Sequence, residues 1–311
     1  DKPLLGALLN LRNRLPFVAR LMQRLSGIAA ERPLPHWHSK GFSQLRKEAQ
    51  LPLAPLTDCD LILWADTFSE SFSPKDLVEV HRMLHAMGFA VAWSGAAGER
   101  PLCCGRTALS VGMIDEAKAR AKEVLDALGP ALERGTPIVG FEPSCLLSIR
   151  DEWRSFGLGE AAEQVGKQTF LFEEWWVAQL KSGRIGPSAH GSGLEILVHG
   201  HCHQKAQAAI NPTLEALRAV GAEVTLIESS CCGMAGSFGY EHRHQEVSKA
   251  MAELSLLPAI RKAPASAWIV ADGFSCRHQI ADLSGLGGER QPMHAAVALA
   301  RILARPVPAN A

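Results

Sequence analysis

A Cys-Cys-Gly motif occurs twice in this sequence, at residues 103–105 and 231–233, and each copy follows an expected strand. A further cysteine, Cys145 in the first half and Cys276 in the second, follows the next expected strand along the chain. The second motif and the second late cysteine follow the first by nearly equal numbers of residues. A pattern that recurs in the same order at a fixed spacing indicates an internal duplication, so we expect two similar halves.

Short apolar runs alternate with helical stretches in both halves, and this alternation predicts an α/β fold with parallel sheets. We therefore expect two pseudo-symmetric repeats, each a small parallel sheet flanked by helices, with the cysteines at the carboxyl ends of the strands. Because these ends share one edge of a sheet, three distant segments should converge there in each repeat. The expected strands lie at 61–66, 89–93, 137–143, 195–201, 223–229 and 268–274.

The sequence divides into three expected segments: an N-terminal amphipathic helix and linker arm at 1–58, a first repeat at 59–186, and a second repeat at 187–311. Within the arm, leucines and arginines at helical spacing predict a basic amphipathic helix over 1–30, with a break at Pro16. Such a helix packs on the main body or on a neighbouring domain. A helix that lies on a membrane surface is the alternative.

Basic and acidic residues are equal in number, 32 of each, which excludes the basic footprint of a nucleic-acid-binding protein. The sequence shows no apolar run long enough to span a membrane and no signal peptide. We therefore expect a cytoplasmic location, or a peripheral one at the inner face of the membrane. The first residue is Asp1 and not methionine, which suggests a piece of a longer protein. No glycine-rich phosphate-binding motif is present.

The strongest candidate site consists of four cysteines of the second repeat: Cys202, Cys231, Cys232 and Cys276. Thiolates are soft ligands, and four of them suffice for one iron–sulfur cluster, for which a 4Fe-4S cluster is our first expectation and zinc the alternative. The long gaps between these cysteines differ from the short spacing typical of structural zinc. Four buried free thiols or a vicinal disulfide are further interpretations, and neither explains the duplicated motif.

Other residues near these cysteines are candidates for supporting roles. Gly233 permits a positive φ, which lets both thiols of the doublet face one site. Lys205 and Arg277 carry positive charge that would offset the charge of a thiolate-bound cluster. Histidines crowd the second repeat, and three are candidates for hydrogen bonds around bound thiolates: His201, His203 and His278.

The first repeat carries a weaker second site made of Cys103, Cys104 and Cys145. Where the second repeat has Cys202, the first has Asp66-Thr67, so one thiolate of a four-ligand site is missing. This half either holds a cluster with one non-cysteine ligand, holds zinc, covers the cluster of the other half, or is degenerate. Cys59 fits no position of the repeat and is expected to be structural.

These motifs resemble the duplicated cysteine-rich CCG domain, a family that includes one of the subunits of heterodisulfide reductase and the glycolate oxidase iron–sulfur subunit. The stretches RPLCCGRT, HGHCHQKA, IESSCCGMAGSFGYE and VADGFSCRHQIAD are most similar to the C-terminal region of bacterial FAD- and Fe-S-containing D-lactate and D-2-hydroxyglutarate dehydrogenases. The late cysteine of the family is often written C-x-x-C, whereas Cys145 and Cys276 are single here. Thr67, at the position where other family members have the first cysteine, looks typical of the dehydrogenase subgroup.

The resemblance implies an oxidoreductase module that carries electrons within a larger flavin-dependent D-2-hydroxyacid dehydrogenase. The implied partners are an FAD-binding dehydrogenase domain and a ferredoxin-like cluster domain. A quinone or another acceptor would receive the electrons, and a membrane surface is a further candidate partner. This chain is expected to bind neither the hydroxyacid nor FAD, so no catalytic residue is assigned. The alternatives are a zinc- or cluster-stabilised docking domain without redox turnover and a thiol–disulfide reductase.

Overall fold

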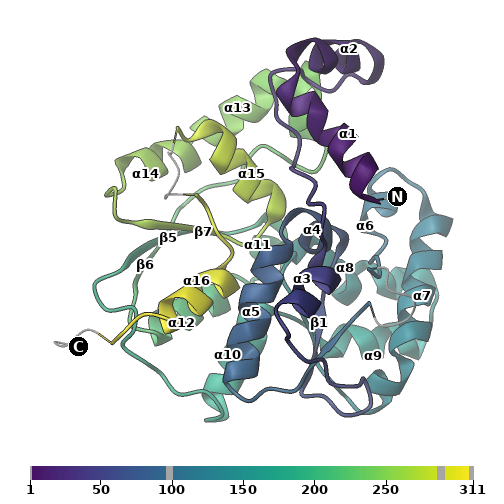
Figure 1. Ribbon diagram of the computed structural model, residues 1–311, viewed down its shortest axis with the longest axis vertical. Helices are drawn as coiled ribbons and strands as arrows, with labels where there is room; N and C mark the ends of the chain where they lie inside the picture. The colour runs from purple at the N-terminus through teal and green to yellow at the C-terminus, as the bar shows by residue number, and fades with distance from the viewer. Residues whose placement is uncertain (1, 96–100, 286–290, 308–311) are drawn as a thin grey trace. The chain divides into compact units, whose positions relative to one another are not determined.

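The computed structural model describes residues 2–95, 101–285 and 291–307 (Figure 1). The chain divides into two compact units, one made of Lys40–Ile185 and the other of Asp1–Ser39 together with Gly186–Ala311. Each unit contains a small parallel sheet with helices around it. The expected mixed α/β class is therefore confirmed.

The sheet of the 40–185 unit has the strand order β2-β1-β3-β4, and every neighbouring pair is parallel. All residues of the central strand β1 are buried, as expected for a parallel strand that is covered on both faces. The strand β4 has no counterpart among the strands expected from the sequence. The strands are β1 (Leu61–Trp64), β2 (Val91–Trp93), β3 (Ile138–Gly140) and β4 (Thr169–Leu171).

Helices cover this sheet and connect its strands. The helix α5 begins at Pro74, whose fixed φ suits the first turn, and it is followed by Gly88 at a φ of 83°. The helices of the unit are α3 (Phe42–Glu48), α4 (Thr67–Phe72), α5 (Pro74–Ala86), α6 (Arg106–Ser110), α7 (Ile114–Glu133), α8 (Pro143–Arg150), α9 (Glu160–Gln168) and α10 (Phe172–Lys181), with a 3₁₀ turn at Glu152–Phe156.

The sheet of the second unit has the order β6-β5-β7, again with parallel pairs. Its strands are β5 (Glu195–His199), β6 (Glu223–Leu226) and β7 (Trp268–Ala271). Its helices after β5 are α11 (Cys202–Ala206), α12 (Asn211–Ala219), α13 (Gln245–Glu253), α14 (Leu256–Lys262), α15 (Phe274–Leu283) and α16 (Ala295–Leu303), with 3₁₀ turns at Phe238–Tyr240 and His242–His244.

Two cysteines belong to the apolar core of this second unit. Cys232 and Cys276 pack in one cluster with side chains of β7, α14 and α15, among them Ile269, Ile260 and Ile280. Both cysteines are nearly inaccessible, at 2% and 1% exposure. The core therefore holds these two thiols in fixed places beside the carboxyl end of the sheet.

The N-terminal segment forms two helices, α1 (Lys2–Arg14) and α2 (Pro16–Ser26), which meet at the expected break before Pro16. The guanidinium of Arg12 is buried and donates to the carbonyl oxygens of Ala29 and Arg32. The backbone N–H of Ala29 donates to the Tyr240 carbonyl oxygen at 2.8 Å. Residues 1–39 group with the second sheet and residues 40–58 with the first.

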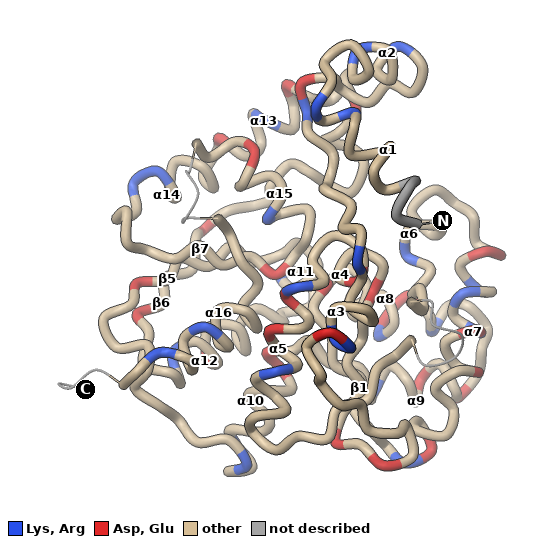
Figure 2. Tube along the Cα trace, viewed as in Figure 1, with Lys and Arg blue, Asp and Glu red and all other residues tan. Residues whose placement is uncertain are grey.

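Bulky apolar side chains of α1 and α2 remain exposed, with Phe17 at 67% and Leu25 at 79% exposure. Arg20 and Arg24 are exposed on the same helix α2. This helix carries basic residues and no acidic residue (Figure 2). Among the described helices, none is long and apolar enough to cross a membrane.

Candidate metal centre

The four cysteines of the second repeat lie on three segments that follow the three strands of the second sheet (Figure 1). Cys202 is the first residue of α11, shortly after β5, and Cys276 lies in the first turn of α15, shortly after β7. The doublet Cys231-Cys232 lies in the connection after β6. Parallel pairing of the strands is what brings these distant segments to one edge.

The thiols of these cysteines form one run of contacts. Cys202 hydrogen-bonds to Cys231, the doublet thiols hydrogen-bond to each other, and Cys232 hydrogen-bonds to Cys276. All described cysteines are free, so neither doublet is a vicinal disulfide in this structure. The structure thus brings the four residues of the strongest candidate site together.

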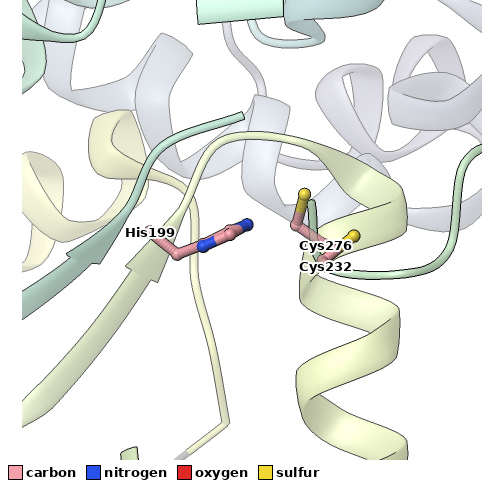
Figure 3. Close-up of side chains that lie close together, drawn as sticks. All are labelled: His199, Cys232 and Cys276. Atoms are coloured by element: carbon pink, nitrogen blue, oxygen red, sulfur yellow. The ribbon is translucent and has the colours of Figure 1, made fainter. Parts of the chain in front are cut away.

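His199, which was not among the three histidines singled out from the sequence, joins this group. One ring nitrogen of His199 and the sulfur atoms of Cys232 and Cys276 all lie within 4.8 Å of one another (Figure 3). The histidine is the last residue of β5 and is fully buried. Its place at a strand end beside Cys202 is the signal that was available in the sequence.

The contacts between the thiols divide them into two pairs by their proton affinity. Hydrogen bonds accepted from neighbouring thiols lower the pKa of Cys231 and of Cys276, despite burial. Hydrogen bonds donated to those neighbours, together with burial, raise the pKa of Cys202 and of Cys232. Four thiols in contact cannot all ionise without a nearby cation, because like charges disfavour one another. The group therefore suits a metal or cluster that supplies positive charge.

Gly233 shapes the doublet. Its φ is 89°, and its backbone N–H donates to the Cys231 sulfur at 3.3 Å. A Cβ at this position would clash with the backbone carbonyl oxygen of Ser248, so only glycine fits. The expected positive φ is present, and the N–H already points to a thiol.

The three histidines named from the sequence have different surroundings. His201 caps α11 by accepting from the His203 N–H at 3.2 Å, and the two rings are stacked. The His201 ring and the Cys276 sulfur both lie within 3.2 Å of the position that a Cβ on Gly273 would occupy. His278 hydrogen-bonds through Nδ1 to the Tyr240 hydroxyl at 3.1 Å, and burial lowers its pKa to about 4. His201 thus lies beside a cysteine thiol.

Lys205 and Arg277 hold the loops that carry the cysteines. The Lys205 ammonium donates to the carbonyl oxygens of Ser229 and Ser230, the two residues before the doublet. The Arg277 guanidinium donates to the Ala271 carbonyl oxygen at 3.0 Å, at the end of β7. Both cations therefore have a positioning role, and Lys205 also places a positive charge near all four thiols.

The cysteines of the first repeat show a similar local geometry in the other unit. Cys104 hydrogen-bonds to both Cys103 and Cys145. The Gly105 N–H donates to the Cys103 sulfur at 3.4 Å, and the φ of Gly105 is 80°. Burial and nearby carboxylates outweigh the hydrogen bond from Cys104 and raise the pKa of Cys145 to about 11. These three thiols thus form a smaller cluster of their own.

The first unit has no thiol at the described strand end that corresponds to Cys202. Thr67 is the first residue of α4, as Cys202 is of α11, and it is exposed. Asp66 caps α4 as His201 caps α11. Burial, followed by the charge of Glu142, raises the pKa of Asp66 to about 6. Cys59 lies outside the cluster; its thiol donates to the Leu56 carbonyl oxygen at 3.8 Å.

Comparison with protein families gives a match at this site. Residues 196–281 match the model of the cysteine-rich domain family, CCG. The matched segment contains all four cysteines of the second repeat and the histidine at the end of β5. This part of the chain therefore matches the cysteine-rich CCG domain family, as the motifs indicated.

Curated relatives carry this region within larger proteins. The chain is 32% identical over 186 residues to D-2-hydroxyglutarate dehydrogenase of Escherichia coli K12, a match covering 59% of this chain and 18% of that protein. It is 28% identical to one subunit of the anaerobic glycerol-3-phosphate dehydrogenase of the same organism, over 66% of this chain and 50% of that protein. It is 27% identical to lactate utilization protein A 1 of Bacillus mycoides, over 58% of this chain and 70% of that protein. The chain thus spans under a fifth of the first relative's length.

Proposed function

We propose that this chain is an iron–sulfur electron-transfer module of a flavin-dependent D-2-hydroxyacid dehydrogenase, of the D-lactate or D-2-hydroxyglutarate type. The observation that carries the proposal is the run of contacts that joins four thiols from three separate segments. Soft thiolates gathered at one place are the ligands that iron–sulfur clusters use. The proposed ligands of a 4Fe-4S cluster are Cys202, Cys231, Cys232 and Cys276.

The surroundings of the thiols fit such a group. The thiols of Cys232 and Cys276 are buried, while Cys202 and Cys231 are half-buried, so solvent reaches only part of the site. The Gly233 N–H supplies a hydrogen bond to a thiolate, and the Lys205 ammonium offsets negative charge near all four cysteines. When bound, the cluster would take up and release single electrons. The chain's residues would set its potential through burial and hydrogen bonding.

Supporting roles follow from the same contacts. We assign Gly233 to holding the doublet and hydrogen-bonding Cys231, and His201 to packing beside Cys276. His203 supports the His201 ring by stacking on it. His278 acts through Tyr240, because its Nδ1 is hydrogen-bonded to that hydroxyl. No residue of this chain is proposed as catalytic.

The relatives supply the proposed context. D-2-hydroxyglutarate dehydrogenase and the anaerobic glycerol-3-phosphate dehydrogenase are oxidoreductases by name, and the first is several times longer than the matched segment. We propose that an FAD-binding dehydrogenase domain and a ferredoxin-like cluster domain accompany this chain, as one polypeptide or as subunits. Electrons would pass from the flavin to this chain and on to a quinone or another acceptor.

We propose that the two sheet-bearing units descend from one duplicated unit and that the first has lost a complete metal site. In support, the glycines of both doublets have a positive φ and donate to the first thiol of their doublet. Thr67 stands where the second unit has Cys202, so Cys103, Cys104 and Cys145 offer one thiolate too few. The first-unit thiols are therefore proposed as a weaker site.

The exposed face of α1 and α2 supports a peripheral position on the cytoplasmic side of a membrane. Its apolar side chains and arginines, with no acidic residue between positions 2 and 30, are complementary to an anionic lipid surface. Sedimentation with vesicles of phosphatidylglycerol and phosphatidylcholine tests this. Binding that falls with added salt and on Phe17→Ser supports it, whereas equal recovery with neutral vesicles, or no binding, overturns it.

The cluster is tested on anaerobically purified chain. We expect iron and acid-labile sulfide in near-equal amounts and a broad visible absorption that dithionite bleaches. Cys276→Ser should lose most of the bound iron, whereas Cys59→Ser, outside the site, should keep it. Colourless protein with stoichiometric zinc would support the docking-domain alternative and contradict the proposal. Full iron content in Cys276→Ser would contradict the ligand set.

A further inference from the structure

The imidazole of His199 is oriented as a metal ligand would be. The residue is fully buried, and the outer end of its ring is directed to the thiols of Cys232 and Cys276 (Figure 3). Among the described residues, its Nε2 forms no hydrogen bond of ordinary geometry. The hydrogen bond from Cys232, and next the interaction with the His199 ring, lower the pKa of the Cys276 thiol. A buried nitrogen without a well-formed hydrogen bond is costly, so its position beside two sulfurs calls for a reason.

The other ring nitrogen is already engaged. Nδ1 of His199 lies 2.8 Å from the Ser229 hydroxyl oxygen, and that hydroxyl donates to the Ile227 carbonyl oxygen at 3.4 Å. In the tautomer that carries its hydrogen on Nδ1, this nitrogen donates to the hydroxyl oxygen and the Nε2 lone pair faces the thiols. Histidines that bind metals usually have the same arrangement, with the second ring nitrogen fixed by a hydrogen bond.

Nitrogen and sulfur lone pairs that face one another at this distance repel unless a cation or a proton lies between them. A metal ion removes this repulsion and gives Nε2 a partner at the same time. We infer that His199 is a ligand of the metal site through Nε2, together with Cys232 and Cys276, so that the site is a mixed imidazole–thiolate centre. This inference rests on the proposed metal site and adds a residue to it.

The first unit offers an internal comparison. His199 is the last residue of β5 and lies two residues before the residue that caps α11; Trp64 is the last residue of β1 and lies two residues before the cap of α4. Tryptophan nitrogen is only a donor and cannot ligate a metal. The unit that lacks the first thiol, with Thr67 at its place, therefore lacks the imidazole as well. The thiol of Cys202 and the imidazole of His199 are thus present together in the second unit and absent together from the first, as expected for parts of one site.

Imidazole is a neutral ligand, so an iron atom bound by His199 receives less negative charge from its ligands than one bound by a further thiolate would. Ser229 would act as a positioning residue, because it fixes which nitrogen carries the proton.

The first experiment uses zinc as the probe and does not depend on iron or on electron transfer. X-ray absorption of the zinc-loaded 311-residue chain should show imidazole scattering from the first coordination sphere. His199→Ala should abolish that signal, whereas His85→Ala, an exposed histidine of the other unit, should retain it. Ser229→Ala should weaken zinc binding about tenfold. An all-sulfur zinc site in the unmodified chain, or loss of the signal in His203→Ala instead, overturns the inference.

The second experiment uses the iron-loaded, dithionite-reduced chain with ¹⁵N-labelled histidine. Pulsed electron paramagnetic resonance should detect a strongly coupled nitrogen that disappears in His199→Ala. A weakly coupled nitrogen alone would mean that the ring only donates a hydrogen bond, and it overturns the inference while leaving the cluster in place. If the chain takes up no iron, the proposed electron-transfer function fails, and the zinc experiment still decides the role of His199.

Discussion

Arg32 forms a salt bridge with Asp282, and its guanidinium Nη1 lies 2.9 Å from the carboxylate oxygen. Asp282 lies in α15, the helix that carries Cys276, and the second guanidinium nitrogen donates to the sulfur of Met234, next to Gly233. Arg32 is 1% exposed. The buried guanidinium of Arg32 thus links the N-terminal segment to α15 and to the loop of the doublet, two of the segments that carry the candidate metal centre.

Removal of this cation should destabilise the second unit. We expect Arg32→Met to lower the free energy of unfolding by about 2–4 kcal/mol, because Asp282 would keep a partly buried charge without its partner. Arg24→Met, at an exposed arginine of α2, should change it by less than about 0.5 kcal/mol. Urea titration followed by circular dichroism measures both. Equal urea midpoints for the two single variants would contradict the stabilising role of Arg32. The double variant Arg32→Met/Asp282→Leu should recover part of the stability lost in Arg32→Met.

A methyl group at Gly233 should disrupt the doublet far more than one at Gly236. Both glycines have a positive φ, but a Cβ at 233 clashes with the Ser248 carbonyl oxygen, whereas nothing lies within 4 Å of one at 236. Gly236→Ala should therefore cost only the conformational strain, about 1 kcal/mol. We expect Gly233→Ala to lose more than twice that stability and most of the bound iron. Similar iron content in both variants would show that the backbone at 233 does not shape the site.

The arrangement of the four thiols could be predicted because it depends on local patterns. Each strand is a short apolar run, each cysteine follows one, and parallel pairing places the ends of such strands at one edge. The break before Pro16 and the positive φ of Gly233 follow from single residues whose backbone preferences are strong. These features required no knowledge of distant contacts.

Other features depend on contacts between residues far apart in sequence. Residues 1–39 join the second unit through buried groups such as Arg32, which in the sequence looks like any other charged residue of a polar stretch. The role proposed for His199 depends on the Ser229 hydroxyl, thirty residues away, which fixes one ring nitrogen. The strand β4 lies directly between α9, which ends at Gln168, and α10, which begins at Phe172, so no turn residues mark it in the sequence. All three features depend on how distant segments pack together in the folded chain.

Asp66 should make the 40–185 unit less stable as the pH rises. Burial and the charge of Glu142 raise its pKa to about 6 from 3.8, so the folded state holds a proton that the unfolded state releases. The favourable contribution is complete below pH 4 and is lost as the pH passes 6, by up to about 3 kcal/mol. Asp66→Asn, which cannot ionise, should therefore gain stability relative to the unmodified chain between pH 5 and pH 7.

Urea unfolding followed by tryptophan fluorescence measures this difference, because five of the seven tryptophans lie in residues 40–185. The comparison is made between variant and unmodified chain at each pH, so that the opposite effect of His81, whose pKa burial lowers to about 4, cancels. Asp115→Asn, at an exposed carboxylate of α7, is the control and should show no such trend. A constant difference between Asp66→Asn and the unmodified chain would show that Asp66 is ionised throughout.

Lys205 should tune the reduction potential of the proposed cluster. Its ammonium lies near all four thiols and is held by the carbonyl oxygens of Ser229 and Ser230. Loss of a positive charge disfavours the added electron, so Lys205→Met should lower the potential, by about 40 mV if the interaction is worth about 1 kcal/mol. Lys205→Arg keeps the charge and should stay close to the unmodified value.

Redox titration monitored by visible absorption distinguishes charge from position. If the ammonium acts by its charge, the potential falls in Lys205→Met and the iron content of both variants stays the same. If Lys205 only holds the Ser229–Ser230 backbone, Lys205→Met loses iron and its remaining cluster titrates at an unchanged potential. A higher potential in Lys205→Met would contradict an electrostatic role altogether, because removing a cation cannot stabilise the more negative state.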